Sequence, residues 1–372
     1  MERIKTKARV IAFYLPQFHP IPENDEWWGK GFTEWTNVGK AKPLFKGHYQ
    51  PRVPADLGYY DLRLPIVREQ QAEMAREVGI EGFCYWHYWF GNGKTLLSEI
   101  FDEVLSSGKP DFPFCLGWAN HDWTRRTWNS AVALERRNTD LMLQTYPGDE
   151  DYIAHFYNVL PAFKDKRYIT IEGRPVFLIY APLDIPNFEN FKTLWNDLAK
   201  ANGLKNIFFI LHIQGRRAMK GDVFKLDGDG FNIDHFTQAE AKVGGFNRYR
   251  IRERLKRIVP RYVPIKKYDY GDIISHWFTE NENSENYFPM IFPNFDRSPR
   301  AGVRAQIYIN STPELFKIHV KESLKLVENR RNDYKMVFLK SWNEWGEGNY
   351  MEPDLTWGHG YLNALREVIV EE

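Results

Sequence analysis

The sequence has few cysteines, no long apolar run and no excess of charge of either sign. Cys84 and Cys115 are its only cysteines, which excludes a disulfide framework and fits a reducing compartment. No stretch reaches the roughly 20 consecutive apolar residues that a membrane span needs. Lys and Arg number 50 against 49 Asp and Glu, which leaves no net charge to attract nucleic acid or an anionic membrane. We therefore expect a neutral partner.

The N-terminal stretch lacks the features of a secretion signal. In "MERIKTKARVIAFYLPQFHP" a few basic residues precede an apolar run that is too short and too polar for a signal peptide. Together with the scarcity of cysteine, this favours a soluble protein of the cytoplasm.

Aromatic residues, in contrast, are abundant. They make up 16% of the chain, and thirteen of them are tryptophans, more than a core of this size usually contains. Many lie beside His, Asn, Gln and Glu. This mixture suits a polar ligand with flat apolar faces, such as a sugar, whose C–H groups lie on an indole while its hydroxyls bond to amides and carboxylates. For any single tryptophan the alternative is a place in the core.

Short apolar runs alternate with helical patterns along most of the chain. This alternation predicts a single (β/α)₈ barrel spanning residues 1–372, with long loops accounting for the length beyond the usual ~250 residues. About residues 239–286 form a lid or insertion in one interpretation, and the alternative for the basic run at 248–267 is a solvated charged face. The predicted strands are 8–16, 81–90, 112–118, 175–180, 207–213, 231–236, 287–293 and 334–342.

Polar and aromatic residues collect just past the predicted strands. In a (β/α)₈ barrel the carboxyl ends of the strands carry the active site, so these residues are expected at one rim, where they would contact a substrate. In strand order they are Gln17, His19, Trp27, Trp28, Glu34 and Trp35; Tyr85, Trp86, His87, Tyr88 and Trp89; Trp118, Asn120, His121, Asp122 and Trp123; Tyr180; His212 and Gln214; Asp234 and His235; Asn294 and Asp296; and Trp342, Asn343 and Trp345.

The stretch "LKSWNEWGEGNYMEP", residues 339–353, adds two acids to this rim, Glu344 and Glu347. Cleaving a glycosidic bond needs one carboxyl to protonate the leaving oxygen and a second as base or nucleophile. A turn through the intervening residues would bring their Cβ atoms within about 5–6 Å and push their titrations apart. Gly346 and Gly348 would let backbone and ligand approach closely. The alternative is that one glutamate caps the last helix and the other is solvated.

Five motifs stand out along the chain, namely "YLPQFHP…NDEWWGKGFTEWTNV", "GFCYWHYWF", "WANHDWTRR", "FPNFDRSPR" and "SWNEWGEGNYMEP". Together they resemble the WbsX-type proteins of bacterial polysaccharide gene clusters. That group is similar to glycoside hydrolase family 99, the endo-α-mannosidases and endo-α-mannanases.

The resemblance implies a (β/α)₈ fold and retaining, endo-acting cleavage of an α-linked glycan without a metal or other cofactor. The family's catalytic motif N-E-W-x-E-G corresponds to residues 343–348. By that match Glu344 would be the general base and Glu347 the general acid, and a 1,2-anhydro sugar would form before water opens it.

Two positions depart from the pattern. The mannosidases usually have His where this chain has Gly346, and many WbsX-like proteins have an acidic residue where this chain has His121. Mannose is therefore not implied as the sugar, and an α-mannan-like glycan or another bacterial polysaccharide fits equally.

Three other functions stay open. A glycosyltransferase or transglycosidase of polysaccharide biosynthesis is one, although no phosphate-binding G-x-G-x-x-G or P-loop pattern is present and the D-x-D at 226–230 is typical of a turn. A non-catalytic carbohydrate-binding protein is another, but binding alone needs no paired acids. A metal enzyme using His19, His87, His121, His212 and His235 is the third, yet none of these has ligand spacing on one element.

Overall fold

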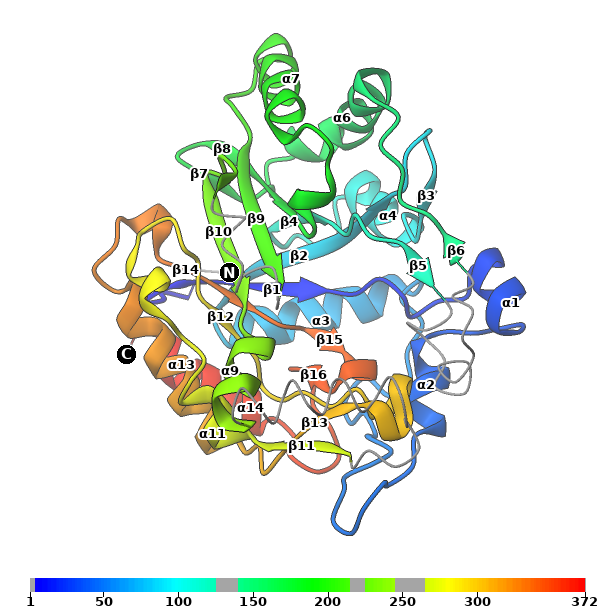
Figure 1. Cartoon of the computed structure of the whole chain (residues 1–372), viewed down its shortest axis with the longest axis vertical. Coiled ribbons are helices and arrows are strands. Elements are labelled where there is room, and N and C mark those ends of the chain that lie inside the picture. Colours follow the sequence, from blue (N-terminus) through cyan, green and yellow to red (C-terminus); the bar gives the residue numbers. More distant parts are fainter. Residues whose placement is uncertain (1–3, 125–139, 215–224, 245–264, 372) are drawn as a thin grey trace.

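The computed structural model describes residues 4–124, 140–214, 225–244 and 265–371, and a barrel of parallel strands lies at its centre (Figure 1). Sheet neighbours run in the order β10, β9, β8, β4, β2, β1, β14, β12. A parallel bridge from Phe231 to Tyr287 joins the two ends of this order, so the barrel is nearly closed. The strands are β1 (Arg9–Tyr14), β2 (Ile80–Trp89), β4 (Phe114–Trp118), β8 (Arg174–Ile179), β9 (Phe208–Gln214), β10 (Gly230–Asp234), β12 (Met290–Ile291) and β14 (Met336–Leu339).

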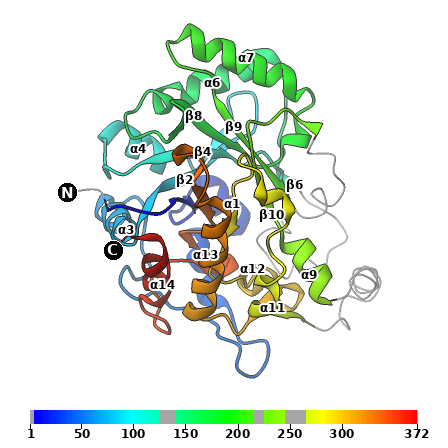
Figure 2. The same cartoon turned by 90° about the vertical axis from the view of Figure 1, so that its left-hand side faces the viewer.

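Helices cover the outside of the barrel (Figure 2). The strands are apolar on both faces for this reason, as β8 (RPVFLI) and β9 (FFILHIQ) show by their nearly continuous burial. No described helix is both long and apolar enough to cross a membrane. The helices are α3 (Pro65–Glu77), α4 (Glu99–Ser107), α6 (Asp149–Phe163), α7 (Phe188–Ala201), α9 (Phe236–Gly244), α11 (Tyr270–Ile274), α13 (Pro313–Val327) and α14 (Gly360–Ile369).

Local sequence explains where the helices begin. The Asn187 side chain accepts a hydrogen bond from the Asn190 N–H at the start of α7. Thr312 does the same for Leu315 at the start of α13, where Pro313 fits the first turn because its missing N–H would have no partner there.

The seventh strand is shorter than predicted. The expected strand over 287–293 contains only Met290 and Ile291, because Pro289 and Pro293 on either side have no N–H to donate to a neighbouring strand. In the predicted lid region the structure shows the end of α9, β11 (Lys266–Asp269), α11 and the 3₁₀ turn η5 (Glu280–Asn283). The basic run at 248–267 lies outside the described residues except for its last three.

Short elements gather at the carboxyl end of the barrel. The segments α2 (Glu34–Lys40), α12 (Ser298–Ala301) and η8 (Trp345–Glu347) contact one another there, and α2 lies below and to the right of the head of the β1 arrow in Figure 1. The remaining short elements of the molecule are α1 (Pro22–Trp28), β3 (Thr95–Leu96), β5 (Trp123–Thr124), β6 (Asp140–Met142), β7 (Thr170–Ile171), η2 (Pro182–Asp184), η6 (Gly302–Arg304), β13 (Gln306–Ile309), η7 (Asn332–Tyr334), β15 (Asn343–Glu344) and β16 (Asn349–Tyr350).

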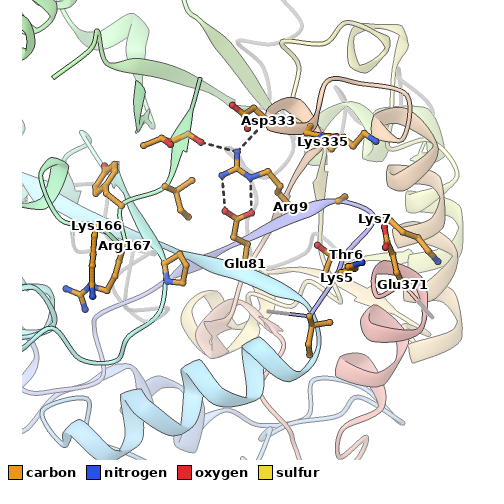
Figure 3. A pocket seen from close by; sticks show the side chains of 17 residues that line it. Lys5, Thr6, Lys7, Arg9, Glu81, Lys166, Arg167, Asp333, Lys335 and Glu371 are labelled. Carbon is orange, nitrogen blue, oxygen red and sulfur yellow. Dashed lines mark hydrogen bonds and ion pairs between the residues drawn. The ribbon is translucent and has the colours of Figure 1, made fainter. Parts of the chain in front are cut away.

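The opposite end of the barrel carries an open pocket of about 820 Å³ (Figure 3). At the start of β1, Arg9 pairs with Glu81 through Nε (2.8 Å) and Nη2 (2.9 Å). Its Nη1 donates to the carbonyls of Thr170 and Asp333. One guanidinium thus joins β1 to β2, β7 and η7. The charged residues that line this pocket are Lys5, Lys7, Arg9, Lys166, Arg167, Lys335, Glu81, Asp333 and Glu371.

Candidate active site

Glu344 and Glu347 lie in a tight turn just past β14. The predicted turn is the 3₁₀ helix η8, which Glu344 precedes and Glu347 ends. The turn is followed by Gly348, whose φ of +66° suits glycine. The two side chains are only 10% and 15% exposed. The last helix, α14, begins at Gly360, so neither glutamate caps it and that alternative is wrong.

A single guanidinium contacts both acids. Arg300 in α12 donates from Nη2 to Glu344 Oε1 (2.5 Å) and from Nη1 to Glu347 Oε1 (3.0 Å). Its Nε donates to Glu34 Oε1 (2.9 Å). Arg297 Nε also lies 3.1 Å from Glu347 Oε1. The two acids of the motif therefore converge, because they share one planar cation.

The surroundings separate the titrations of the two acids. Burial raises the pKa of Glu344 to about 7, and Arg300 offsets only part of this rise. Burial also acts to raise the pKa of Glu347, but Arg297, Arg300 and Lys340 outweigh it and lower the pKa to about 2. Near neutral pH Glu344 is therefore partly protonated while Glu347 is ionised, so the proton that the pair shares in the free protein resides mainly on Glu344.

Lys340 is the third cation of this group and stands at the end of β14. Its Nζ lies 3.5 Å from Asp234 Oδ2, at the end of β10, and 4.8 Å from the centre of the Phe236 ring. Burial lowers its pKa, but Asp234 and Glu347 outweigh burial, so the pKa is raised overall. Lys340 therefore stays charged.

An aromatic cluster from four strand ends lies beside the pair. Tyr180 stacks on His212 at 5.3 Å and meets Trp86 edge-on at 5.5 Å. His121 lies 5.0 Å from Tyr180. Burial lowers the pKa of His121, and the charge of Glu347 is among those that offset part of this lowering. Burial lowers the pKa of His212 to about 4, so this ring is neutral near pH 7. Trp86, His121 and Tyr180 keep part of their surface exposed.

A second aromatic group forms from the first and third predicted loops. Trp123 lies 6.0 Å from Trp27 and 5.2 Å from Tyr88, both edge-on. Burial raises the pKa of Tyr88, and the charge of Glu344 adds to the rise. Tyr88 thus belongs to the electrostatic surroundings of the pair.

Three predicted tryptophans are fully buried and hold loops in place. Trp118 donates to the carbonyl of Trp89, and Trp342 packs on the core near Phe83. Trp345 donates from Nε1 to Glu352 Oε2 at 2.6 Å. Its ring also stacks on Tyr350 and lies 5.4 Å from Trp35, while Trp28 lies against Phe32.

The predicted amides join neighbouring loops. Asn343 exchanges two hydrogen bonds with the backbone of Leu15, and Asn120 does so with Ala181. Asn294 caps its own neighbour by accepting from the Phe295 N–H. Gln17 is buried, and its backbone carbonyl accepts from the Glu34 N–H, while its side-chain amide has no hydrogen-bond partner among the described residues. These contacts fix the backbone from which the acids project.

Two other predicted residues, Asp296 and His87, contact polar partners within the protein. Asp296 Oδ2 accepts from Gln50 and contacts His48, both at 2.8 Å. His87 Nε2 lies 2.9 Å from His155 Nε2. Tyr85 is in the core, and His19 is buried. Whether any of these residues contacts a substrate stays a prediction.

The sequence predicts that Gly346 lets a ligand approach the backbone closely, but the structure leaves no room for a ligand there. A Cβ there would lie 1.9 Å from Glu34 Oε1 and 2.8 Å from Arg300 Nε. The expectation was wrong because the space beside this glycine holds the protein's own ion pair.

The D-x-D sequence lies far from the acids along β10. Asp227 and Asp229 precede the strand, at its amino end, where Asp229 pairs with Arg174 at 2.7 Å and Asp227 with Lys192 at 2.7 Å. Within the described part of the chain, no group of three or more His, Cys, Asp or Glu residues could hold a metal ion.

Sequence reasoning did not single out Arg297, Arg300 or Lys340. Lys340 directly follows β14 and could have been found by the same strand-end rule that gave the two acids. The two arginines follow β12 within "FPNFDRSPR", but nothing in that motif predicts that they reach a loop more than forty residues onward.

Comparison with known proteins supplies a family. Residues 10–365 match the family described as glycosyltransferase WbsX. Two proteins of Xanthomonas campestris pv. campestris, strains B100 and ATCC 33913, both described as uncharacterized protein WxcX, are 33% identical over 363 and 370 residues. The matches cover 97% of this chain and 50% of each relative, so the chain spans about half the length of these relatives.

Solved structures support the fold. A glycoside hydrolase-like protein has a TM-score of 0.61 at 15% identity, covering 100% of this chain and 96% of its own. The GH99 endo-alpha-mannosidase from Bacteroides thetaiotaomicron has TM-scores of 0.52 and 0.51 in two structures at 14% identity, covering 96% and 97% of this chain and 95% of its own. At such identities the likeness concerns the fold, and the predicted (β/α)₈ architecture is confirmed.

Proposed function

This chain belongs to the glycosyltransferase WbsX family, and we propose that it is a retaining glycoside hydrolase that cuts within an α-linked glycan. The substrate would be an α-mannan-like or other bacterial polysaccharide. The observation that carries the proposal is that Glu344 and Glu347 share one guanidinium while their pKa values are driven apart. Such a pair offers one protonated and one ionised carboxyl at the same place, as glycosidic cleavage requires.

The resemblance to family 99 supports distinct roles for the two acids. Glu344 would take the proton of the sugar's 2-hydroxyl as O2 attacks the anomeric carbon. Glu347 would give its proton to the leaving oxygen as the glycosidic bond breaks. Water would then open the 1,2-anhydro sugar, and two inversions at the anomeric carbon give net retention.

These roles require the shared proton to move from Glu344 to Glu347 when a sugar binds. A sugar over Glu347 would remove its remaining contact with water and raise its pKa. A 2-hydroxyl donating to Glu344 would favour the ionised form of that acid. Both effects act in the direction that the reaction needs, and the two carboxylates lie close enough to contact the same guanidinium.

The sugar would lie on the partly exposed aromatic cluster. His121 and Tyr180 combine partial exposure with an electrostatic interaction with Glu347, and the partly exposed Trp86 lies against Tyr180. Their rings offer apolar faces for sugar C–H groups. The buried indoles of Trp118, Trp342 and Trp345 would act indirectly, by holding the loops.

Transfer of the sugar to another sugar is the second candidate, because the family is described as a glycosyltransferase. The same acids could pass the opened sugar to a hydroxyl acceptor instead of water. A donor activated by a nucleotide is less well supported, since the D-x-D aspartates are engaged in ion pairs at the amino end of β10.

A substrate screen tests the proposal. The purified protein is incubated with defined α-mannans, α-glucans and bacterial O-polysaccharides, with and without nucleotide sugars and a chelator. Release of fragments without a nucleotide sugar is expected, and NMR of the first-formed product should show the α anomer. A first-formed β anomer, or turnover only with a nucleotide sugar, would contradict hydrolysis with retention.

An activated leaving group separates the two roles. A substrate with an aryl leaving group needs little protonation, so it should restore much of the activity lost in Glu347→Gln and little of that lost in Glu344→Gln. The measurement is kcat/KM for both variants on aryl and natural substrates. Equal restoration would remove the distinction, and restoration of Glu344→Gln alone would reverse it.

A further inference from the structure

Arg300 is the one described residue whose side chain bonds to both proposed catalytic acids. It uses three different nitrogens for three carboxylates, those of Glu34, Glu344 and Glu347. The side chain is 5% exposed. A planar guanidinium can hold several carboxylates at fixed angles, whereas an ammonium is a point charge without such geometry.

The backbone around Arg300 is fastened to the turn that carries the acids. The Asp296 N–H donates to the carbonyl of Glu347 at 2.6 Å. The Asp296 carboxylate in turn accepts from the Ser298 N–H at the start of α12 and is held by Gln50. Arg300 thus projects from a short helix whose position is set relative to Glu347 itself.

Glu34 and Gly346 complete the arrangement from two other loops. Glu34 comes from the loop after β1 and holds Arg300 Nε. The Glu34–Arg300 pair packs so closely on Gly346 that a Cβ at position 346 would overlap the Glu34 carboxylate. The ion pair therefore occupies the volume that any side chain at this position would need.

We propose that Arg300, anchored by Glu34 and admitted by Gly346, is a positioning residue that fixes the separation of Glu344 and Glu347 and determines how they share a proton. The effect of Arg300 on catalysis rests on the proposed function. The effect of Arg300 on the titration of Glu344 and Glu347 is independent of that function, because both carboxyl groups titrate in the free protein whether or not a glycan is cleaved.

Two variants should move the titrations in opposite directions. Arg300→Lys removes the fork that stabilises both carboxylates, so the titration of Glu347 should rise by about one pH unit or more. Glu34→Gln removes a negative neighbour that raises the pKa of Glu344, so the titration of Glu344 should fall. An arginine with a merely structural role would change stability without these opposite shifts.

The test is ¹³C NMR of carboxyl-labelled glutamate in the full chain, with Glu344→Gln and Glu347→Gln spectra assigning the two signals. Arg331→Lys is the matched control, because Arg331 also contacts two carboxylates, those of Glu172 and Glu285, but at an exposed site. It should leave both signals unchanged.

Shifts of both signals in the stated directions support the proposal. Unchanged titration of Glu347 in folded Arg300→Lys overturns it. If Arg300→Lys does not fold, the proposal is tested with Glu34→Gln alone. An unchanged or raised titration midpoint of Glu344 in that variant overturns the proposal.

Kinetics provide a second readout once a substrate is known. Arg300→Lys should lower kcat by roughly 10–100-fold with little change in KM, since misplaced acids affect the reacting state more than binding. The pH dependence of kcat/KM should shift with the NMR titrations. Absence of glycan cleavage in the wild type would refute the proposed function and leave the titration result standing.

Discussion

The two ends of the barrel differ in how an arginine is paired with carboxylates. At the amino end Arg9 faces one carboxylate, Glu81, and its other donors meet carbonyls. At the carboxyl end Arg300 faces three carboxylates. Arg9 thus matches one cation to one anion, whereas Arg300 is shared by three carboxylates, with Arg297 and Lys340 as further cations that act on Glu347.

The two ends also differ in how many buried polar atoms lack a hydrogen-bond partner. In the loop after β1, the buried side chains of Gln17, Asn24 and Asn37 have polar atoms without a partner. No residue lining the described pocket at the amino end has such an atom. Buried polar groups without a partner lower stability and are typical of functional sites, so this difference supports a functional role for the carboxyl end.

Glutamate-to-glutamine substitutions at each end should give the largest difference between effects on catalysis and effects on stability. Glu344→Gln and Glu347→Gln should each lower kcat by about 10²–10⁴-fold, the range lost with a general acid or base, while melting temperature changes little. Glu81→Gln should leave kcat unchanged and lower the free energy of unfolding by about 1–3 kcal/mol, because Arg9 loses its charged acceptor. Turnover assays and chemical denaturation of the three variants make the comparison.

Two results would break the assignment of roles to the ends. One is near wild-type turnover in either carboxyl-end variant on the true substrate. The other is a large loss of turnover in folded Glu81→Gln, which would mean that the amino end also affects the chemistry.

The barrel and its two acids could be predicted because their signals are local. Apolar runs mark the strands, and the strand-end rule places Glu344 and Glu347 at the correct rim. The turn at 345–347 follows from the glycine-rich motif. Even the shortened β12 could have been foreseen from Pro289 and Pro293, since each removes a backbone donor.

The electrostatics of the site could not be predicted, because they depend on contacts between distant segments. Arg300 lies 44 residues before Glu344 and 266 after Glu34. No periodicity or spacing indicates that these three meet. For the same reason the sequence suggests space for a ligand at Gly346, whereas in the structure the missing side chain makes room for Glu34.

A methyl group at Gly346 tests how much the carboxyl end depends on that close packing. Gly346→Ala should lower the free energy of unfolding by about 1–3 kcal/mol through steric overlap and lower kcat roughly 10–100-fold as Arg300 moves. Gly39→Ala is the matched control, because Gly39 in α2 has nothing within 4 Å of its added Cβ. It should raise stability by about 0.5–1 kcal/mol, as expected for Gly→Ala in a helix. Equal behaviour of the two variants would show that the Glu34–Arg300 pair yields without cost.

The smallest expected effect is a pH dependence of stability that originates at the carboxyl end. Since burial raises the pKa of Glu344 from 4.5 to about 7, the folded state binds this proton more tightly than the unfolded state. The resulting stabilisation is present in full below pH 4.5 and is lost as pH rises through about 7. Glu240 and Glu352, whose pKa values burial also raises to about 7, contribute to the same trend, so the wild-type curve alone cannot assign it to Glu344.

The difference between wild type and Glu344→Gln isolates this acid. Between pH 5 and pH 8 the variant should gain on the order of 1–2 kcal/mol relative to wild type in urea unfolding, because glutamine never has to bury a charge beside Glu34 and Glu347. A difference that stays constant over this range would mean that Arg300 fully compensates the charge of Glu344, and the crowding of acids at this end of the barrel would then carry no cost.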